Sequence, residues 1–337
     1  MTLDDQLLAN NVESTQVRAF DPSKLVACPE CSRSNPPTRA NCLYCGAVLG
    51  ISVELPTSTT TTTVSEIEAE DFVNVVAVPA CSDGREVNAE IAQSLNLEPA
   101  ELSMLLSGRV APLYATSATD QAQAIVEKLR SAGIEPLTIS DAQLSLATPP
   151  KQAAVLGIQN DALTAIERRT GKRVSMAWND VVLIVLGRLY FTTTEVEQKR
   201  DKSKQVLDER VLTADEAVLD IYPAADGIGW RIRVGSFDFS CLGQEKKATA
   251  FENFRALTNL LRRNSPQAVC DDAYVRLRAA LNKVWPLAAH AGATERRRTR
   301  AREINATATT SDNELQFTRY SRLLRFFQMS ESESDAK

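Results

Sequence analysis

The sequence contains a single histidine, His290, and this scarcity limits the chemistry that the chain can perform. A Ser-His-Asp or Cys-His arrangement needs a histidine base, and a histidine-rich metal site needs several histidine ligands. Glycine motifs for phosphate or dinucleotide binding are missing as well. The acidic residues are scattered, so no pair can be nominated as catalytic acid and base. We therefore expect a protein that is not an enzyme, without catalytic or cofactor-binding residues, and we place His290 in an exposed linker.

Long apolar runs are also missing. The longest run, Val181 to Leu186, is far shorter than the roughly 20 residues that span a bilayer. The N-terminal stretch MTLDDQLLANNVES is acidic and lacks the apolar segment of a secretory signal. The net charge of −5 disfavours a whole-molecule attraction to nucleic acid or to acidic lipid. We expect a cytoplasmic protein without a transmembrane segment.

The chain of 337 residues is long enough for two or three domains of roughly 100–200 residues each. Its apolar (44%) and charged (24%) contents are typical of soluble globular proteins. The patterning along the chain predicts a multi-domain α+β protein. We expect a flexible N-terminus over 1–24, a cysteine-rich segment over 25–50, a threonine-rich linker over 51–71, a small α+β domain over 72–145, a larger α+β domain over 151–290, and an arginine-rich and acidic tail over 291–337.

Four of the seven cysteines cluster in CPECSRSNPPTRANCLYCG, at Cys28, Cys31, Cys42 and Cys45. Two Cys-x2-Cys pairs separated by ten residues can direct four thiolates at one ion, and such a tetrahedral sulfur site suits Zn²⁺. The pattern resembles the zinc-ribbon family. Four cysteine ligands close the coordination shell, so the zinc is expected to be structural, with no position for water or substrate. Iron in a rubredoxin-like site and a redox role of the thiols are the alternatives.

Zinc ribbons bind RNA, DNA or protein, so the metal site does not identify the partner. The connecting loop carries Arg33 and Arg39, and Tyr44 lies between the last two ligands, so an arginine–aromatic surface could stack on a base. With two arginines we expect an unidentified protein partner or a purely structural ribbon, and nucleic acid is the alternative. The three remaining cysteines lack partner spacing and are expected to be small core residues: Cys81, Cys241 and Cys270.

The region 72–142 alternates between strand and helix signals. FVNVVAV, VAPLYA and IEPLTI are typical of strands, whereas EVNAEIAQSLN, PAELSMLLS and the segment from Thr119 to Ala132 have apolar residues at helical spacing. Thr119 is a candidate N-cap of the last helix, and Gly133 lies where a C-cap glycine is expected. The expected order of elements is β-α-α-β-α-β.

The run SATDQAQAIVEKLRSAGIEPLTI resembles the last helix and strand of the C-terminal domain of the bacterial ribosomal stalk protein. The matching residues are Ser117, Gln121, Ala122, Leu129, Ala132 and Gly133. These are packing positions, so the resemblance implies the fold of this domain. The lysine-rich factor-binding helix of that family has no counterpart, because AEIAQSLNLEPAELSMLLSG contains no lysine. Recruitment of translation factors therefore does not carry over.

The region 151–290 has strand signals first and helix signals last, which indicates an α+β domain. We expect strands at VSMAW, VVLIVLGRLYF, AVLDIYP and WRIRVGSFDFS, and helices at QNDALTAIERRTG, ATAFENFRALTNLLRRN and CDDAYVRLRAALNKVWP. The charged stretch VEQKRDKSKQVLDER is expected to be a solvated loop or an exposed helix. Short strands followed by a helix resemble the pleckstrin-homology-like small barrel, a likeness of fold that says little about function.

The tail from about residue 291 is expected to be weakly structured. Its run ERRRTRAR, with five arginines from Arg296 to Arg302, is interpreted as an exposed linker, and a docking or phosphate-contacting arm is the alternative. LQFTRYSRLLRFFQ is expected to return and pack on the body; an amphipathic helix for a partner or a membrane surface is the alternative.

Together these features favour a non-enzymatic zinc-binding protein that acts in protein interaction or regulation. Two alternatives stay open. One is nucleic-acid binding through the zinc ribbon and the arginine-rich tail. The other is an enzyme with an unrecognised site in 151–290.

Overall fold

The computed structural model describes residues 25–28, 34–35, 72–77, 89–199, 206–225, 227–298 and 303–335. The chain divides into two compact units, Met1–Thr57 and Ser58–Lys337, and the predicted mixture of helices and strands is confirmed. In the N-terminal unit, strand β1 (Val26–Ala27) pairs antiparallel with β2 (Ser34–Asn35). The remainder of the predicted ribbon lies outside the described residues.

The first part of the larger unit has the expected β-α-α-β-α-β order. Its elements are β3 (Val73–Ala77), α1 (Ala89–Ser94), α2 (Pro99–Leu106), β4 (Ala111–Thr116), α3 (Thr119–Ser131) and β5 (Pro136–Ser140). The three strands form an antiparallel sheet with β3 in the centre. The predicted stripe of α3 is buried at Ala122, Ile125, Val126 and Leu129.

The ends of α3 differ slightly from the expectation. Thr119 is the first helical residue rather than the N-cap, which is Ala118. The hydroxyl of Thr116 accepts a hydrogen bond from the Ala118 amide at 3.1 Å and so supports the turn into the helix. Gly133 has φ of 76°, as expected for a glycine after a helix C-terminus.

A nine-stranded sheet forms the centre of the larger unit within the described residues. The strands are β6 (Lys151–Ile158), β7 (Ala162–Glu167), β8 (Arg173–Ala177), β9 (Val181–Lys199), β10 (Val206–Pro223), β11 (Trp230–Arg233), β12 (Val269–Asp271), β13 (Ala288–Arg298) and β14 (Glu303–Asp312). Their order is β13-β14-β9-β10-β11-β6-β7-β8, and β12 adds to β9 in parallel. In the described part of the chain, β13 and β8 are the two ends of this order.

Three predictions for this region are wrong. The segment expected to hold a helix at 159–171 contains β7, because Leu163 and Ala165 alternate into the core between β6 and β8. The charged stretch 196–210 provides the ends of β9 and β10 in its described parts, because backbone pairing rather than an apolar pattern fixes these strands. The strand WRIRVGSFDFS ends at Arg233 and continues as 3₁₀ turns at Val234–Ser236 and Phe239–Glu245. A further 3₁₀ turn lies at Trp178–Asp180.

The expectation of a weakly structured tail is also wrong for its described part. Residues 288–298 and 303–312 form the antiparallel strands β13 and β14, and helix α6 (Glu314–Asp335) follows. Strand β14 pairs with β9 along nine residues. The strand at 303–312 is therefore stabilised by residues more than 100 positions away in the sequence, which a local pattern does not reveal. The expectation that LQFTRYSRLLRFFQ packs on the body is confirmed, since Phe317, Tyr320 and Leu323 are fully buried.

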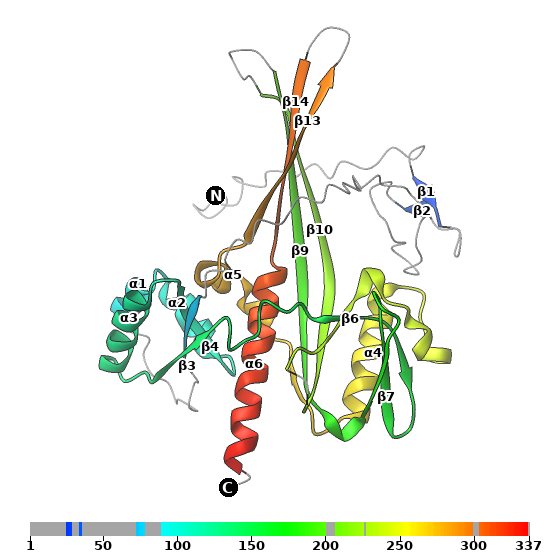
Figure 1. Ribbon diagram of the computed structural model, residues 1–337, viewed down its shortest axis with the longest axis horizontal. Coiled ribbons are helices and arrows are strands. Elements are labelled where there is room, and N and C mark those ends of the chain that lie inside the picture. Colours follow the sequence, from blue (N-terminus) through cyan, green and yellow to red (C-terminus); the bar gives the residue numbers. More distant parts are fainter. Residues whose placement is uncertain are drawn as a thin grey trace, which may run out of the picture. The chain divides into compact units, whose positions relative to one another are not determined.

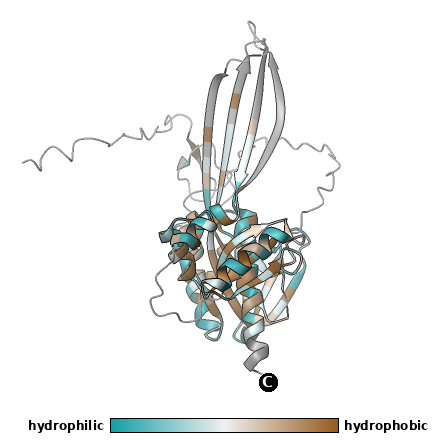
Figure 2. Ribbon diagram, turned by 90° about the vertical axis from the view of Figure 1, so that its left-hand side faces the viewer, coloured by the Kyte–Doolittle hydropathy of each residue, from teal (hydrophilic) through white to brown (hydrophobic). Residues whose placement is uncertain are grey.

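Helices cover both faces of the central sheet. Val218 and Tyr222 of β10 lie in a core with α5 (Tyr274–Val284), α6 and the small domain, whereas Leu219 and Ile221 face a second core with α4 (Ala250–Asn264). Figure 2 shows apolar segments gathered on the strands of the body and polar residues on the outer faces of helices. The two helices predicted here form, and their apolar side chains Phe254, Leu257, Tyr274 and Leu277 are buried, whereas Phe251 at the start of α4 is 59% exposed.

The far parts of four strands extend beyond the helices, as Figure 1 shows. We call them the arm: residues 191–199 of β9, 206–214 of β10, and strands β13 and β14. At about 3.3 Å per residue, the β9 part of the arm is about 30 Å long. Among the helices of the described residues, none combines the length and the apolarity needed to cross a membrane.

Candidate functional site

One of the four predicted metal ligands, Cys28, lies among the described residues. Cys28 follows β1 directly, and 2% of its surface is exposed. The pairs Val26↔Asn35 and Ala27↔Ser34 reverse the chain around the first Cys-x2-Cys, and a buried thiol at the end of such a hairpin suits a ribbon ligand. Cys31, Cys42 and Cys45 lie outside the described residues, as do Arg33, Arg39 and Tyr44. The described residues contain no cluster of three or more metal-ligating side chains.

Cys241 and Cys270 are partly buried and pack against the core beside α4, although they were expected to lie within the core. Cys81 lies outside the described residues. Burial raises the pKa of the Cys241 thiol to about 11, with a contribution from Asp238. Burial also raises the pKa of Cys270, whose sulfur accepts a hydrogen bond from Arg262 Nε at 2.9 Å. Both side chains are therefore neutral thiols near pH 7, which disfavours a nucleophilic role.

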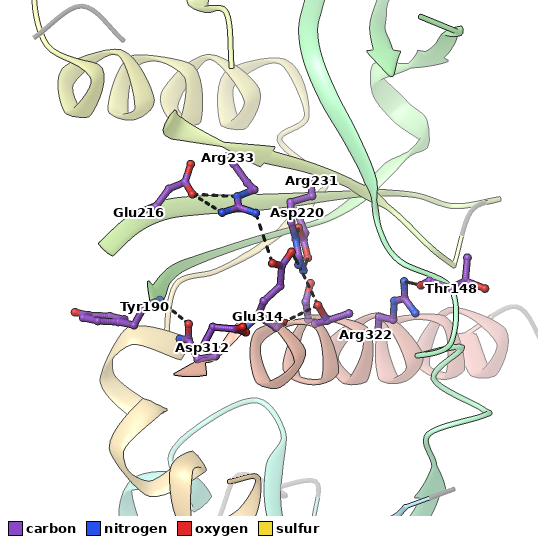
Figure 3. Close-up of polar contacts among 12 residues, drawn as sticks. Thr148, Tyr190, Glu216, Asp220, Arg231, Arg233, Asp312, Glu314 and Arg322 are labelled. Atoms are coloured by element: carbon purple, nitrogen blue, oxygen red, sulfur yellow. Dashed lines mark hydrogen bonds and ion pairs between the residues drawn. The ribbon is translucent and has the colours of Figure 1, made fainter. Parts of the chain in front are cut away.

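The most extensive polar cluster surrounds α6. Every residue of this helix from 316 to 325 is buried, including six polar or charged ones: Gln316, Thr318, Arg319, Ser321, Arg322 and Arg325. A helix buried all round cannot leave its polar side chains to water, so they need partners in the surrounding elements. Figure 3 shows α6 between the central sheet and the connection that follows β5.

An ion pair joins the central sheet to the first turns of α6. Arg231 of β11 donates two hydrogen bonds of 2.8 Å to Asp220 of β10, and both side chains are almost completely buried. Arg231 also donates to Thr318 Oγ1 at 3.0 Å and to Glu314 Oε1 at 3.3 Å (Figure 3). Burial acts to lower the pKa of Arg231, but the charge and hydrogen bonds of Asp220 outweigh it, so the pKa is raised and the guanidinium stays charged.

Glu314 connects this pair to a second one. Its Oε2 lies 3.5 Å from Arg233 Nη1, and Arg233 donates to Glu216 Oε2 through Nε and Nη2 at 3.0 and 2.8 Å. Glu216 Oε1 accepts from the Gly235 amide at 2.7 Å. Because Glu314 is the first residue of α6, its negative charge is also favoured by the helix dipole.

The other side of α6 holds the connection between β5 and β6, residues 141–150. Arg319 donates to both carboxylate oxygens of Asp141. Arg322 donates to the carbonyl oxygens of Leu144 at 3.3 Å, Ser145, and Thr148 at 2.5 Å. Arg325 donates to the carbonyls at the end of β10, those of Pro223 and the following Ala224. These arginines therefore fix the small domain and the central sheet to one helix.

Asn313 stands at the base of the arm, between β14 and α6. Its Nδ2 donates to the Arg188 carbonyl at 2.9 Å, and its Oδ1 accepts from the Tyr190 amide at 2.6 Å. On this edge of β9, β12 pairs with residues 183–185 and β14 with residues 191–199. The Asn313 side chain fills the interval between these two strands and satisfies buried backbone groups of β9.

The arm holds the residues that were expected in a linker. His290 and Arg296 to Arg298 lie in β13, where His290 is opposite Thr310 and Arg298 is opposite Glu303. Ile304 of β14 pairs with Lys199, the last residue of β9. The far ends of these strands therefore meet at the same end of the arm. The sequence pattern could not predict this, because threonine-rich and charged strands lack the apolar alternation of a half-buried strand.

Comparison with protein-family models, with curated proteins and with solved structures found no match to this chain.

Proposed function

We propose that the chain is a non-enzymatic, cytoplasmic zinc-binding protein that acts in protein interaction or regulation. The observation that carries this proposal is the anchoring of α6. The buried polar side chains of this helix join the central sheet, the connection 141–150 and the base of the arm. This arrangement favours a rigid body that presents an exposed strand assembly to a partner.

The spacing of the four cysteines supports a structural zinc at Cys28, Cys31, Cys42 and Cys45. The short β1–β2 pairing around the first cysteine pair is compatible with a zinc ribbon, since a segment this short has little core and gains most of its folding energy from metal. On this proposal the ribbon is joined to the larger unit by the threonine-rich linker 51–71 and can contact a partner independently.

A non-enzymatic role is supported by the described groups with displaced pKa values. Burial raises the pKa of Tyr222, Tyr274 and Tyr320. The hydroxyls of Tyr222 and Tyr274 are hydrogen-bonded to side chains of α6, and the hydroxyl of Tyr320 donates to Asp271 of β12. These groups connect elements of the fold, which accounts for their burial without a reaction.

The likeness of 72–145 to the ribosomal stalk domain supports a common fold and no common partner. Helix α2 packs on α5, where Lys283 Nζ lies 2.8 Å from Glu101 Oε2. The salt bridge and the adjacent core tie this face of the small domain to the rest of the unit. We therefore assign the small domain a structural role in this chain.

The proposal is tested by capture of partners from the native cell. Full-length protein and a variant lacking residues 1–56 serve as baits, because the deletion removes the cysteine cluster and leaves the larger unit. Proteins retained specifically by one or both baits are expected and would assign the interaction to one unit. Absence of any specific partner with both baits would contradict an interaction function.

A further inference from the structure

The register of the arm brings together basic residues that are almost 100 positions apart in the sequence. Ile304 of β14 pairs with Lys199 on one side and with Arg297 on the other. Neighbouring strands are about 4.8 Å apart, so the backbones of Lys199 and Arg297 are separated by about 10 Å. Arg296 and Arg298 flank Arg297 in β13. The ends of β9 and β13 at the tip of the arm therefore carry four basic residues, Lys199 and Arg296 to Arg298.

The sequence concentrates further positive charge next to these strand ends. Of the thirteen residues in 199–204 and 296–302, nine are basic and one is acidic. The whole chain has a net charge of −5, so the rest of the sequence is acidic. Positive charge is thus concentrated in two short segments of the sequence, and attraction of an anion would be local.

A row of acidic residues follows directly behind the basic end. Glu197 pairs with Asp208 on one side and with Ala306 on the other, and Ala306 pairs with Glu295. The row of Lys199 and Arg297 lies beyond this acidic row, and the last pair of β13 and β14 joins Arg298 to Glu303, so the end of the arm carries a net positive charge. Charge complementarity favours contact at the end of the arm.

We infer that the end of the arm, at Lys199 and Arg296 to Arg298, contacts the phosphate backbone of a double-stranded nucleic acid. This inference adds a nucleic-acid contact at the arm to the proposed interaction function. Arginine suits phosphate because its planar guanidinium can form paired hydrogen bonds with phosphate oxygens. Arg296, Arg297 and Arg298 are consecutive residues of β13, which is an end strand of the sheet among the described residues.

The composition and width of the arm define the type of contact. Beyond Phe191 at the base of the arm, the sequence has no Phe, Tyr or Trp from Thr192 to Leu212 or from Ala288 to Asp312, so the far end of the arm lacks aromatic rings that stack on unpaired bases or anchor in a bilayer interface. Four strands at about 4.8 Å are broader than the two-stranded ribbon that enters a major groove about 12 Å wide. The arm therefore contacts phosphates across the groove and does not read base sequence.

The decisive experiment measures binding of the full-length protein to a short labelled DNA duplex of arbitrary sequence, by fluorescence anisotropy over a series of salt concentrations. The variant R296A/R297A/R298A is expected to bind at least about tenfold more weakly at low salt, and its salt dependence to be shallower by up to about three logarithmic units per decade of salt. K199A, on a different strand, is expected to weaken binding in the same direction. Changing the base sequence of the duplex is expected to leave affinity unchanged.

The matched control is R169A/K172A/R173A, which removes three basic residues from the exposed turn and strand end between β7 and β8. This control is expected to bind as the unaltered protein does, and circular dichroism checks that both variants remain folded. No duplex binding at low salt, or equal losses in the control and in R296A/R297A/R298A, would overturn the inference. Binding to vesicles rich in phosphatidylserine without binding to the duplex would also overturn it. Partners that are still captured from the cell by a protein without duplex binding would leave the broader interaction function standing.

Discussion

Asn313 takes the place of a strand beside Tyr190. The amide of Tyr190 donates to Asn313 Oδ1 at 2.6 Å, and Asn313 Nδ2 donates to the carbonyl of Arg188 at 2.9 Å. A second bond from Nδ2, of 2.9 Å, reaches the hydroxyl of Tyr274 on α5. One side chain thus bridges the interval between two strands and connects the base of the arm to a helix of the body.

Replacement of Asn313 by alanine is expected to destabilise the larger unit. The substitution leaves the Tyr190 amide and the Arg188 carbonyl without this partner, and each unsatisfied buried group costs about 1–3 kcal/mol. Urea unfolding followed by tryptophan fluorescence measures the loss, because Trp178, Trp230 and Trp285 all belong to this unit. Asn264→Ala is the control, since its amide bonds within α4 to Leu260, and a loss as large as that of Asn313→Ala would contradict the assigned role.

Removal of one partner from the buried Arg231–Asp220 pair is expected to be more harmful than removal of both. Arg231→Met leaves Asp220 as an unpaired buried charge, which costs about 3–5 kcal/mol. The double change Arg231→Met with Asp220→Leu is expected to recover part of this loss, because it leaves no isolated charge. The exposed pair Arg263–Glu245 provides the control, and Arg263→Met is expected to cost less than about 1 kcal/mol. Additive losses in the double variant would contradict a coupled pair.

Gly187 allows α6 to approach β9. A Cβ at this position would lie 2.4 Å from a ring carbon of Phe317, so Gly187→Ala is expected to destabilise by about 1–3 kcal/mol through overpacking. Adding Phe317→Leu should relieve the clash and recover part of the loss. Gly157→Ala is the matched control on the same sheet, because its Cβ would meet Thr164 at an ordinary 3.5 Å. Equal unfolding midpoints for the two alanine variants would argue against close packing at Gly187.

The stability of the larger unit is expected to depend on Asp271 in mildly acidic solution. Burial raises the pKa of Asp271, although hydrogen bonds from Tyr320 and the Ala273 amide act to lower it. A carboxyl with a raised pKa binds its proton more tightly in the folded protein, so its contribution to stability increases as the pH falls from neutral through the folded pKa. Asp271→Asn keeps an oxygen acceptor for Tyr320 and is expected to remove this dependence. Urea unfolding at a series of pH values tests this, and an unchanged profile would contradict it.

One zinc ion per chain is expected in purified protein. Elemental analysis should detect it in the unaltered chain and show its loss when Cys28 and Cys42 are both replaced by serine, because the change removes one ligand from each pair. Cys241→Ser is the control and should retain the metal. Metal-free protein with a folded N-terminal unit would contradict the zinc ribbon.

Local patterns predicted the small domain well. The stripe of α3 at Ala122, Ile125, Val126 and Leu129 and the flanking strands specify the element order without knowledge of distant residues. The burial of Arg231 could not be predicted from its strand, because α6, which is about 85 residues further along the chain, covers this side of β11. The arm could not be predicted, since its strands are specified by pairing between residues far apart in the chain. Of the predicted metal ligands, Cys28 is the one that the described residues include.

The position of α6 at the centre of the fold has a consequence for biosynthesis. The helix that joins the sheet, the connection 141–150 and the small domain is made after all of them, so the core that it shares with α5 and the small domain stays incomplete until its residues have emerged from the ribosome. During that interval Asp220 and Arg231 can pair with each other, but the apolar side chains that later meet Phe317 and Tyr320 are exposed. Nascent chains that pause before residue 314 would therefore be the form of this protein most dependent on chaperones.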